Sequence, residues 1–385
     1  MKLAFQLAYK NLIGAGLRTW LNVGVLSFVF VVIIMFNGLL EGWSEQSIRE
    51  SIQWEYAHGH LLHKDYDPLD PFTIKDGHGK MDEKSTSNLS PILIRQATIY
   101  PEGRVKAIAL KGIEAAQNTL QLPTYAFADA KADIPAIIGV RMAETANLRV
   151  GDQVLLRWRD KNGTFDAADI TVVEIFNTNV ASVDQGQVWI PIEKLWDMTG
   201  LENEATLWVA NENYSQKAIK GWRFEDQDEL LSEFRSLMQM EKFGSALFYV
   251  ILLIIALIAI FDTQVLSIFR RQKEIGTYVA LGMTRQEVMK LFTVEGALYS
   301  ILGVIVGCIY GIPLFILFHK IGFTLPEFYQ GMGINIPTTI IPVFGLTIII
   351  GTGIILIISA TIVSLLPARN IARMDPVSAL KGKLQ

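Results

Sequence analysis

The stretch from Phe243 to Phe269 reads FGSALFYVILLIIALIAIFDTQVLSIF, and this apolar run decides the fold. A helix needs roughly 20 mostly apolar residues to cross a hydrocarbon core of about 30 Å, so the run predicts a transmembrane helix. Runs of similar length at Thr19–Leu40, Phe292–Phe318 and Thr339–Leu366 predict three more. Each must be helical because backbone groups in lipid have no water to bond. We therefore expect an α-helical membrane protein with four transmembrane helices.

Basic residues predict the orientation of these spans. Lys and Arg are frequent in residues 1–18, 270–291 and 367–385, whereas the short loop 319–338 holds only Lys320. Because short cytoplasmic segments carry the excess of positive charge, both termini and the 270–291 segment are expected in the cytoplasm. Residues 41–242 then form a large extracytoplasmic domain, and 319–338 an external loop.

The charge of the chain is divided between these parts. The 41–242 segment has 32 acidic and 21 basic residues, a net −11, and the remainder has 6 and 13, a net +7, giving −4 in total. A segment of about 200 residues can bury a core of its own. An acidic, water-soluble domain is therefore expected between the first and second spans.

Local patterns predict that this domain is mixed α and β. QVLLRWR (Gln153–Arg159) alternates apolar and polar residues, DKNG follows as a turn, and DITVVEIF (Asp169–Phe176) completes a hairpin. Shorter strand signals lie at His58–Leu62 and Ala107–Leu110. Pro191 and Gly200 bracket a helix, IEKLWDMT.

Three other segments carry weaker expectations. Tyr66–Pro91 is rich in turn formers and charge, and predicts a long loop or insertion with little order. The pattern from Gln227 predicts a helix that continues into the second span, with Gly244 as its weak point. Residues 1–18 suit a helix lying in the cytoplasmic membrane interface, or alternatively a frayed basic tail.

The residues offer little support for chemistry within the chain. The one cysteine, Cys308, lies in an apolar run, so it builds neither a disulfide nor a thiolate metal site in the large domain. His58 and His60 would share one strand face and His63 the other, which argues against zinc. We expect no catalytic residue, bound cofactor or metal in this chain, and no nucleic-acid partner, because the domain's basic residues are outnumbered and dispersed.

The cytoplasmic segment RRQKEIGTYVALGMTRQEV (Arg270–Val288) suggests a docking surface for another protein. Glu274 offers a carboxylate to a basic partner, and Gly276 and Gly282 allow close approach or a turn. An ordinary positive loop would explain its first basic residues but not the rest of the pattern.

This segment resembles the ERxxEIGxxxAxGxxxxxI signature of FtsX-like, or MacB-type (type VII), ABC transporter permeases, with Arg270 at a position that is usually acidic. The tail LLPARNIARMDPVSALK from Leu365 is similar to that family's closing PxxxAxxxxPxxAL signature. Within the large domain, GHLLHKDY from Gly59, IIGVRMAETANLRVGDQVLL from Ile137 and VWIPIEKLWDMTG resemble the family's external domain, most closely that of the lipoprotein-releasing permeases.

The resemblance implies a non-catalytic permease subunit in a bacterial inner membrane, with the large domain in the periplasm. Its implied partners are cytoplasmic ABC ATPase subunits and a second permease, identical or related. ATP and Mg would bind those ATPases, because no GxxxxGK[ST] motif occurs here. The contact with the ATPase would be made by residues in or beside the helix after the second span: Arg271, Glu274, Ile275, Gly276, Leu281, Gly282 and Arg285. The basic Arg270 leaves the polarity of that contact open.

Small and polar residues in the spans carry further hypotheses. Gly296, Ser300, Gly303, Gly307 and Gly311 form a stripe on the third span, which predicts close helix packing. Asp262 and Glu295 are ionisable groups within or at the edge of apolar runs, and either structural hydrogen bonding or a transport role would explain them. By family analogy the first and second spans would border a lateral opening, where Asn22 and Asn37 are candidate polar marks.

The leading functional hypothesis is ATP-driven extraction of lipoproteins from the membrane towards a periplasmic acceptor. Burial of an acyl chain is worth about 0.8 kcal/mol per CH₂, so extraction requires work. Export of peptides, toxins or drugs from the periplasm is the alternative within the same architecture. Mechanical activation of a cell-wall hydrolase, without transport, is another, although a domain of this size favours handling of cargo.

Overall fold

The computed structural model describes residues 17–82, 86–215, 219–325 and 337–371. The chain divides into two compact units. The helical unit comprises Met1–Trp43, Met238–Phe323 and Ile340–Gln385, and the α/β unit comprises Ser44–Leu237 and Thr324–Thr339. The predicted interfacial helix at 1–18 and the closing signature at the C-terminus lie largely outside the described residues.

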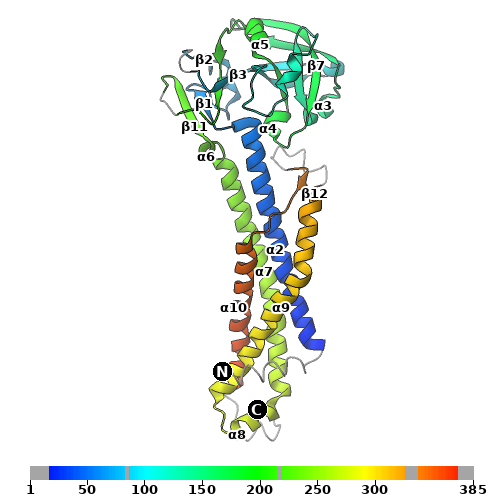
Figure 1. The fold of residues 1–385 in the computed structure, drawn as a ribbon, viewed down its shortest axis with the longest axis vertical. Helices are drawn as coiled ribbons and strands as arrows, with labels where there is room; N and C mark the ends of the chain where they lie inside the picture. The colour runs from blue at the N-terminus through cyan, green and yellow to red at the C-terminus, as the bar shows by residue number, and fades with distance from the viewer. Residues whose placement is uncertain (1–16, 83–85, 216–218, 326–336, 372–385) are drawn as a thin grey trace. The chain divides into compact units, whose positions relative to one another are not determined.

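Long apolar helices form the helical unit, and four in the described part of the chain are long and apolar enough to cross a membrane. They are α2 (Leu17–Ser51), α7 (Ser232–Arg270), α9 (Arg285–Ile321) and α10 (Leu346–Ile371). The short α8 (Gln272–Ala280) lies between α7 and α9 (Figure 1). α9 continues through Pro313 without ending there.

The fourth span begins later than the sequence pattern predicts. Thr339–Ile340 form strand β13, which pairs with β12 (Phe323–Thr324), and the helix starts only at Leu346. Proline disfavours a helical conformation at the residue before it, so Pro342 argues against a helix that runs from Thr339 through Ile341. The predicted boundary at Thr339 was therefore wrong by several residues.

The helix that was expected to start at Gln227 is divided near its beginning. Asp226 caps α6 (Gln227–Leu230) and forms a capping box with Glu229. After Leu231, α7 begins at Ser232 and continues past Gly244 to Arg270. The predicted continuity through Gly244 is confirmed, but the helix start is not.

The α/β unit is built on a nine-stranded sheet in the part of the chain that the structure describes. Its strands follow the order β11-β1-β10-β3-β4-β8-β5-β7-β6. Their bounds are β1 (Gly59–His63), β3 (Leu89–Ile99), β4 (Lys106–Ile113), β5 (Pro135–Gly139), β6 (Gln153–Arg159), β7 (Phe165–Phe176), β8 (Gln187–Pro191), β10 (Leu207–Ala210) and β11 (Trp222–Asp226). Two short strands, β2 (Gly79–Lys80) and β9 (Glu204–Ala205), form a separate pair.

Strand β3 closes part of this sheet into a barrel. Its first residues pair with β10, and Ala97–Ile99 pair with β6 at the far end of the strand order. Strands β3, β4, β8, β5, β7 and β6 thus form a ring. Alternate side chains of these strands point inward, and the enclosed core includes Leu110, Ile138 and Leu156, each 0% exposed.

Short helices surround the barrel. They are α3 (Val140–Ala146), α4 (Ala181–Asp184) and α5 (Ile192–Thr199), with η1 (Ile52–Tyr56), η2 (Pro71–Lys75) and η5 (Thr124–Phe127) as single turns. Helix α5 has the predicted bounds, and Gly200 ends it in a left-handed conformation with φ +69°. The predicted hairpin is also confirmed as β6 and β7.

The prediction of a long, weakly ordered loop at Tyr66–Pro91 was wrong for much of that stretch. Asp70 caps η2 by accepting from the Phe72 N–H, and Tyr66 and Ile74 pack in a hydrophobic cluster. Strand β3 begins at Leu89, before Pro91. Turn-forming residues here build capped local structure instead of a free loop.

Candidate functional site

The connection between α7 and α9 is a compact helical turn. Hydrogen bonds between Thr284 and Glu287 form a capping box that starts α9: the Thr284 N–H donates to Glu287 Oε2 at 2.8 Å. Gly282 has φ +100°, a conformation that glycine adopts without steric cost, and it lets the chain turn after α8. The sequence therefore defines both ends of this turn.

Arg271 joins α8 to α9. Its Nε donates to Glu274 Oε2 at 2.7 Å and its Nη1 to Glu295 Oε2 at 3.1 Å. The guanidinium also lies 5.0 Å from the Phe292 ring centroid. Burial disfavours the charged form, but the two carboxylates outweigh this and raise the pKa of Arg271.

Glu295 is the buried member of this group. Its side chain is 2% exposed, and its other carboxylate oxygen accepts from the Tyr299 hydroxyl at 3.3 Å. A buried carboxylate must be paired or hydrogen-bonded to persist. Structural pairing with Arg271 therefore accounts for an acidic residue in this apolar run.

The predicted coupling residues fall into an inner and an outer set. Ile275 and Gly276 are buried, and Ile275 packs with Ile268 of α7, Phe292 of α9 and Ala368 of α10. The outer set is exposed: Glu274, Leu281, Gly282 and Arg285. Leu281 is 80% exposed, so its side chain is open to solvent in this chain alone.

Phe292, Glu295 and Tyr299 complete this site, but the sequence pattern did not assign them to it. The one available signal was a carboxylate at the edge of an apolar run. Its partner, Arg271, lies 24 positions earlier, so only the reversal of the chain through α8 reveals the pair.

The small-residue stripe of α9 faces two helices. A Cβ at Gly303 would lie 2.8 Å from Leu26 Cβ, and one at Gly307 would lie 2.7 Å from Phe30, both on α2. Gly311 similarly approaches Val31. Gly296 instead lies against Ser364 of α10, one turn before the fully buried Ser300. Larger side chains at these glycines would push the helices apart.

The two asparagines of α2 have different surroundings. Asn22 is 6% exposed and its Oδ1 accepts from Thr263 Oγ1 of α7 at 3.1 Å. The neighbouring Gln264 is 1% exposed, and its amide has no hydrogen-bond partner among the described residues. Asn37 instead donates to the Ile33 carbonyl of its own helix. Asn22 therefore lies in the contact between α2 and α7, the two helices expected to border an opening.

The three histidines considered for a metal site, His58, His60 and His63, have different surroundings in the structure. His60 is buried and donates to the Glu55 carbonyl at 2.9 Å, and burial lowers the pKa of His60 to about 4. His63 packs edge-on against Trp222, and His58 is exposed. Their placement does not bring the three rings together.

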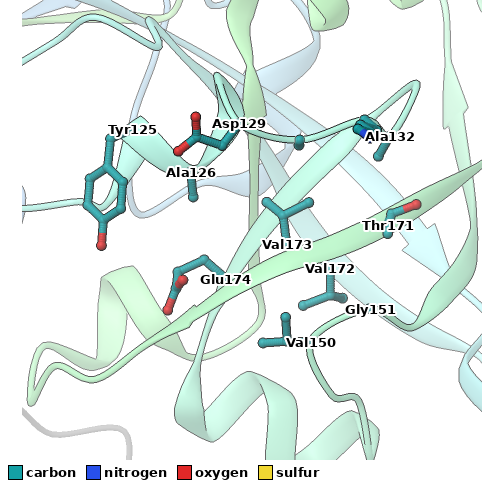
Figure 2. A pocket seen from close by; sticks show the side chains of 12 residues that line it. Tyr125, Ala126, Asp129, Ala132, Val150, Gly151, Thr171, Val172, Val173 and Glu174 are labelled. Atoms are coloured by element: carbon teal, nitrogen blue, oxygen red, sulfur yellow. The ribbon is translucent and has the colours of Figure 1, made fainter.

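A small pocket of about 370 Å³ lies beside β7 and η5 in the α/β unit (Figure 2). Asp129, Glu174 and Tyr125 supply oxygen atoms on one side of it, and Val150 and Val173 supply apolar surface. The described residues that line it include no serine, cysteine or histidine.

Comparisons with known proteins agree with the helical arrangement. Residues 246–376 match the FtsX-like permease C-terminal domain. The chain is 30% identical over 131 residues to a macrolide export ATP-binding/permease protein MacB of Agrobacterium fabrum, covering 34% of this chain and 18% of that protein. It is 27% identical over 247 residues to the MacB protein of Acinetobacter baylyi, covering 60% of this chain and 34% of that protein.

The chain thus spans about a third or less of the length of these relatives. Among solved structures, the extracellular domain of the noncanonic ABC-type transporter YknZ from Gram-positive bacteria aligns with 44% of this chain and 99% of that chain. The alignment has 14% identity and a TM-score of 0.24.

Proposed function

We propose that this chain, an FtsX-like permease of the MacB type, is a membrane subunit that receives force from a separate cytoplasmic ATPase through α8 and the turn after it. One observation carries the proposal. α8 is joined to α9 by the pair between Arg271 and the buried Glu295, while Glu274, Leu281 and Arg285 lie on the exposed surface. Force on that outer surface would therefore be transmitted to α9.

Close packing offers a route from α9 to the other helices. The glycines at 303 and 307 bring α9 against α2, and Gly296 brings it against Ser364 of α10. Closely packed helices shift as units because their side chains have little free space. A displacement of α9 would therefore move its neighbours too.

Exposed apolar side chains on the helical unit favour lipids and a second permease as its partners. Ile251, Ile255 and Ile258 of α7 are 56%, 56% and 55% exposed. Asp262 is exposed on the same apolar helix, where a carboxylate facing lipid would be costly. A second permease covering Asp262 would shield that charge.

We place the chain in a bacterial inner membrane with both termini in the cytoplasm and the α/β unit in the periplasm. The positive charge of residues 270–291 supports this orientation, since the ATPase would have to meet α8 on the cytoplasmic side. ATP and Mg would bind the ATPase partner, and this chain would remain non-catalytic.

For the cargo, we propose a lipoprotein that leaves the membrane between α2 and α7 and passes to a periplasmic acceptor. Asn22 and Asn37 are the polar residues proposed for that path. Export of a small molecule or peptide is the second candidate, because the relatives reported above are named macrolide export proteins. Mass spectrometry of the nucleotide-free complex separates them, since an acylated protein supports the first.

Two substitutions at one position test the ATPase contact. Alanine and tryptophan at position 282 both meet the backbone strain of φ +100°, which costs about 1–3 kcal/mol. No atom lies within 4 Å of a Cβ placed there, so Gly282→Trp and Gly282→Ala differ only in the bulk presented outward. We expect Gly282→Trp to insert normally but to lose ATP-driven transport, and Gly282→Ala to retain most of it. Equal activity of both variants would contradict the contact.

A further inference from the structure

A second, larger cavity of about 900 Å³ lies on the outside of the barrel in the α/β unit. We call it the outer groove. Its floor is formed by β3, β4, β6 and β8, and its walls come from η1, α4 and the segment from Tyr66 to Ile74. None of its lining residues belongs to the helical unit or to the proposed ATPase contact.

The register of the strands explains why the outer surface of the barrel is concave here. Thr98 of β3 is opposite Ala107 of β4, and Gln96 is opposite Ala109. Ala109 is in turn beside Gln187 of β8. Alternate residues of a strand share a face, so two alanines lie side by side on the outer surface among longer side chains. The floor therefore combines short apolar side chains with polar ones, and it is large enough for an organic molecule.

One edge of the outer groove carries two arginines held on a common ring. The guanidinium carbons of Arg157 and Arg159 lie 3.8 and 4.3 Å from the Phe165 ring centroid. No ion pair among the described residues involves either arginine. A guanidinium stacked on an aromatic face keeps its in-plane N–H groups available to an oxyanion.

The opposite edge is polar but nearly neutral. Lys111 lies over the Trp189 ring at 4.8 Å, and Glu55 accepts from the Ser182 hydroxyl at 2.5 Å. Burial lowers the pKa of Lys111 and raises that of Glu55, and each charge opposes the shift of the other. The charged lining residues are therefore three cations and one carboxylate, in a segment whose net charge is −11.

We propose that the outer groove binds an organic phosphate. Its phosphate group would accept hydrogen bonds from Arg157 and Arg159, and its organic part would lie over Ala107 and Ala109. A tetrahedral anion can accept from two guanidinium groups at once, and Arg is the side chain best suited to such contacts. The cavity is much larger than a phosphate ion, and Pro68, Pro71 and Ile74 provide apolar walls for the remainder. A soluble phosphate ester and a phospholipid headgroup present this same chemistry.

Calorimetric titration of the full chain in an uncharged detergent tests this site. The probes are inorganic phosphate, glycerol 3-phosphate and dihexanoyl phosphatidic acid, in low-salt buffer. We expect saturable binding of the two esters, weakened about tenfold or more in Arg157→Gln/Arg159→Gln, since charge-assisted hydrogen bonds are lost. The matched control, Arg104→Gln/Arg149→Gln, removes the same charge from exposed arginines of this unit outside the groove.

A second pair of variants tests the location without changing charge. Ala107→Trp fills the exposed floor and should abolish ester binding, whereas Leu155→Trp, at an exposed position of β6 outside the groove, should not. Tighter binding of dihexanoyl phosphatidic acid than of glycerol 3-phosphate would assign a lipid source, and equal affinity a soluble one. The proposal is overturned if neither ester binds saturably, or if both arginine double variants lose affinity equally.

Discussion

The barrel of the α/β unit and the helices of the helical unit bury apolar side chains to very different extents. Leu110 and Leu156 are completely enclosed in the barrel, whereas Ile255 and Ile258 of α7 are more than half exposed. The barrel completes its own core because β3 pairs with both β4 and β6 and so closes the ring of strands. On helices long and apolar enough to cross a membrane, such exposed side chains suit contact with lipid.

The Arg271–Glu295 pair should give the largest effect in the helical unit. Glu295→Ala leaves a partly buried guanidinium without its buried partner, and breaking such a pair costs about 3–5 kcal/mol. We expect a clear drop in the thermal unfolding temperature in detergent. Glu274→Ala removes the exposed partner of the same arginine and should cost at most about 1 kcal/mol. Equal losses in the two variants would contradict the structural role of Glu295.

Truncation of a buried side chain inside the barrel tests whether the α/β unit has a closed core. Leu110 is fully enclosed, so Leu110→Ala should destabilise the α/β unit by about 2–5 kcal/mol. Chemical denaturation followed by tryptophan fluorescence measures the change. Leu155→Ala, at an outward position of β6, should cost less than about 1 kcal/mol. A mild effect at Leu110 would mean that the barrel is not closed as described.

His60 predicts a pH dependence confined to the α/β unit. Burial lowers its pKa to about 4 in the folded state, against 6.5 for the ordinary side chain. The unfolded chain therefore binds more protons below pH 6.5, and stability should fall by about 3 kcal/mol as the pH drops from 6.5 to 4. Glu55 acts in the opposite direction, because burial raises its pKa.

The contribution of His60 is isolated by comparing variants. His60→Gln should lose the fall in stability between pH 6.5 and 4, while His58→Gln, at an exposed position, should keep it. Unfolding curves at several pH values provide the measurement. An unchanged pH profile in His60→Gln would show that the imidazole is not buried in its neutral form.

The smallest effect concerns the glycines of α9. Gly307→Val would place its side chain against Phe30, and overpacking of this kind costs about 1–3 kcal/mol. Gly351→Val is the control, because no atom lies within 4 Å of a Cβ at that position of α10. Equal melting temperatures for the two variants would argue against close packing of α9 on α2.

Much of this architecture could be predicted from local sequence. The length of the apolar runs alone predicted four helices, and Pro191 and Gly200 predicted both ends of α5 correctly. The turn sequence DKNG between alternating strands indicated the β6–β7 hairpin. These features depend on neighbouring residues, so one sequence contains enough information to find them.

Contacts between residues far apart in the sequence could not be predicted from local patterns. Nothing local to Ala97 indicates that β3 leaves β10 and joins β6, which closes the barrel. The same applies to Glu295, whose partner becomes visible only when α8 reverses the chain. The local pattern also predicted a start for the fourth span that is too early, because hydropathy contains no information on how Pro342 restricts the backbone.

Photocrosslinking from position 281 tests the central claim most directly. A photoreactive residue replacing Leu281 in the full chain, irradiated in native membranes, should form a covalent product with an ATPase subunit. The same residue at Ile258, on the exposed apolar face of α7, should give no such product. A missing ATPase product at position 281, or equal yields at both positions, would contradict entry of force through α8.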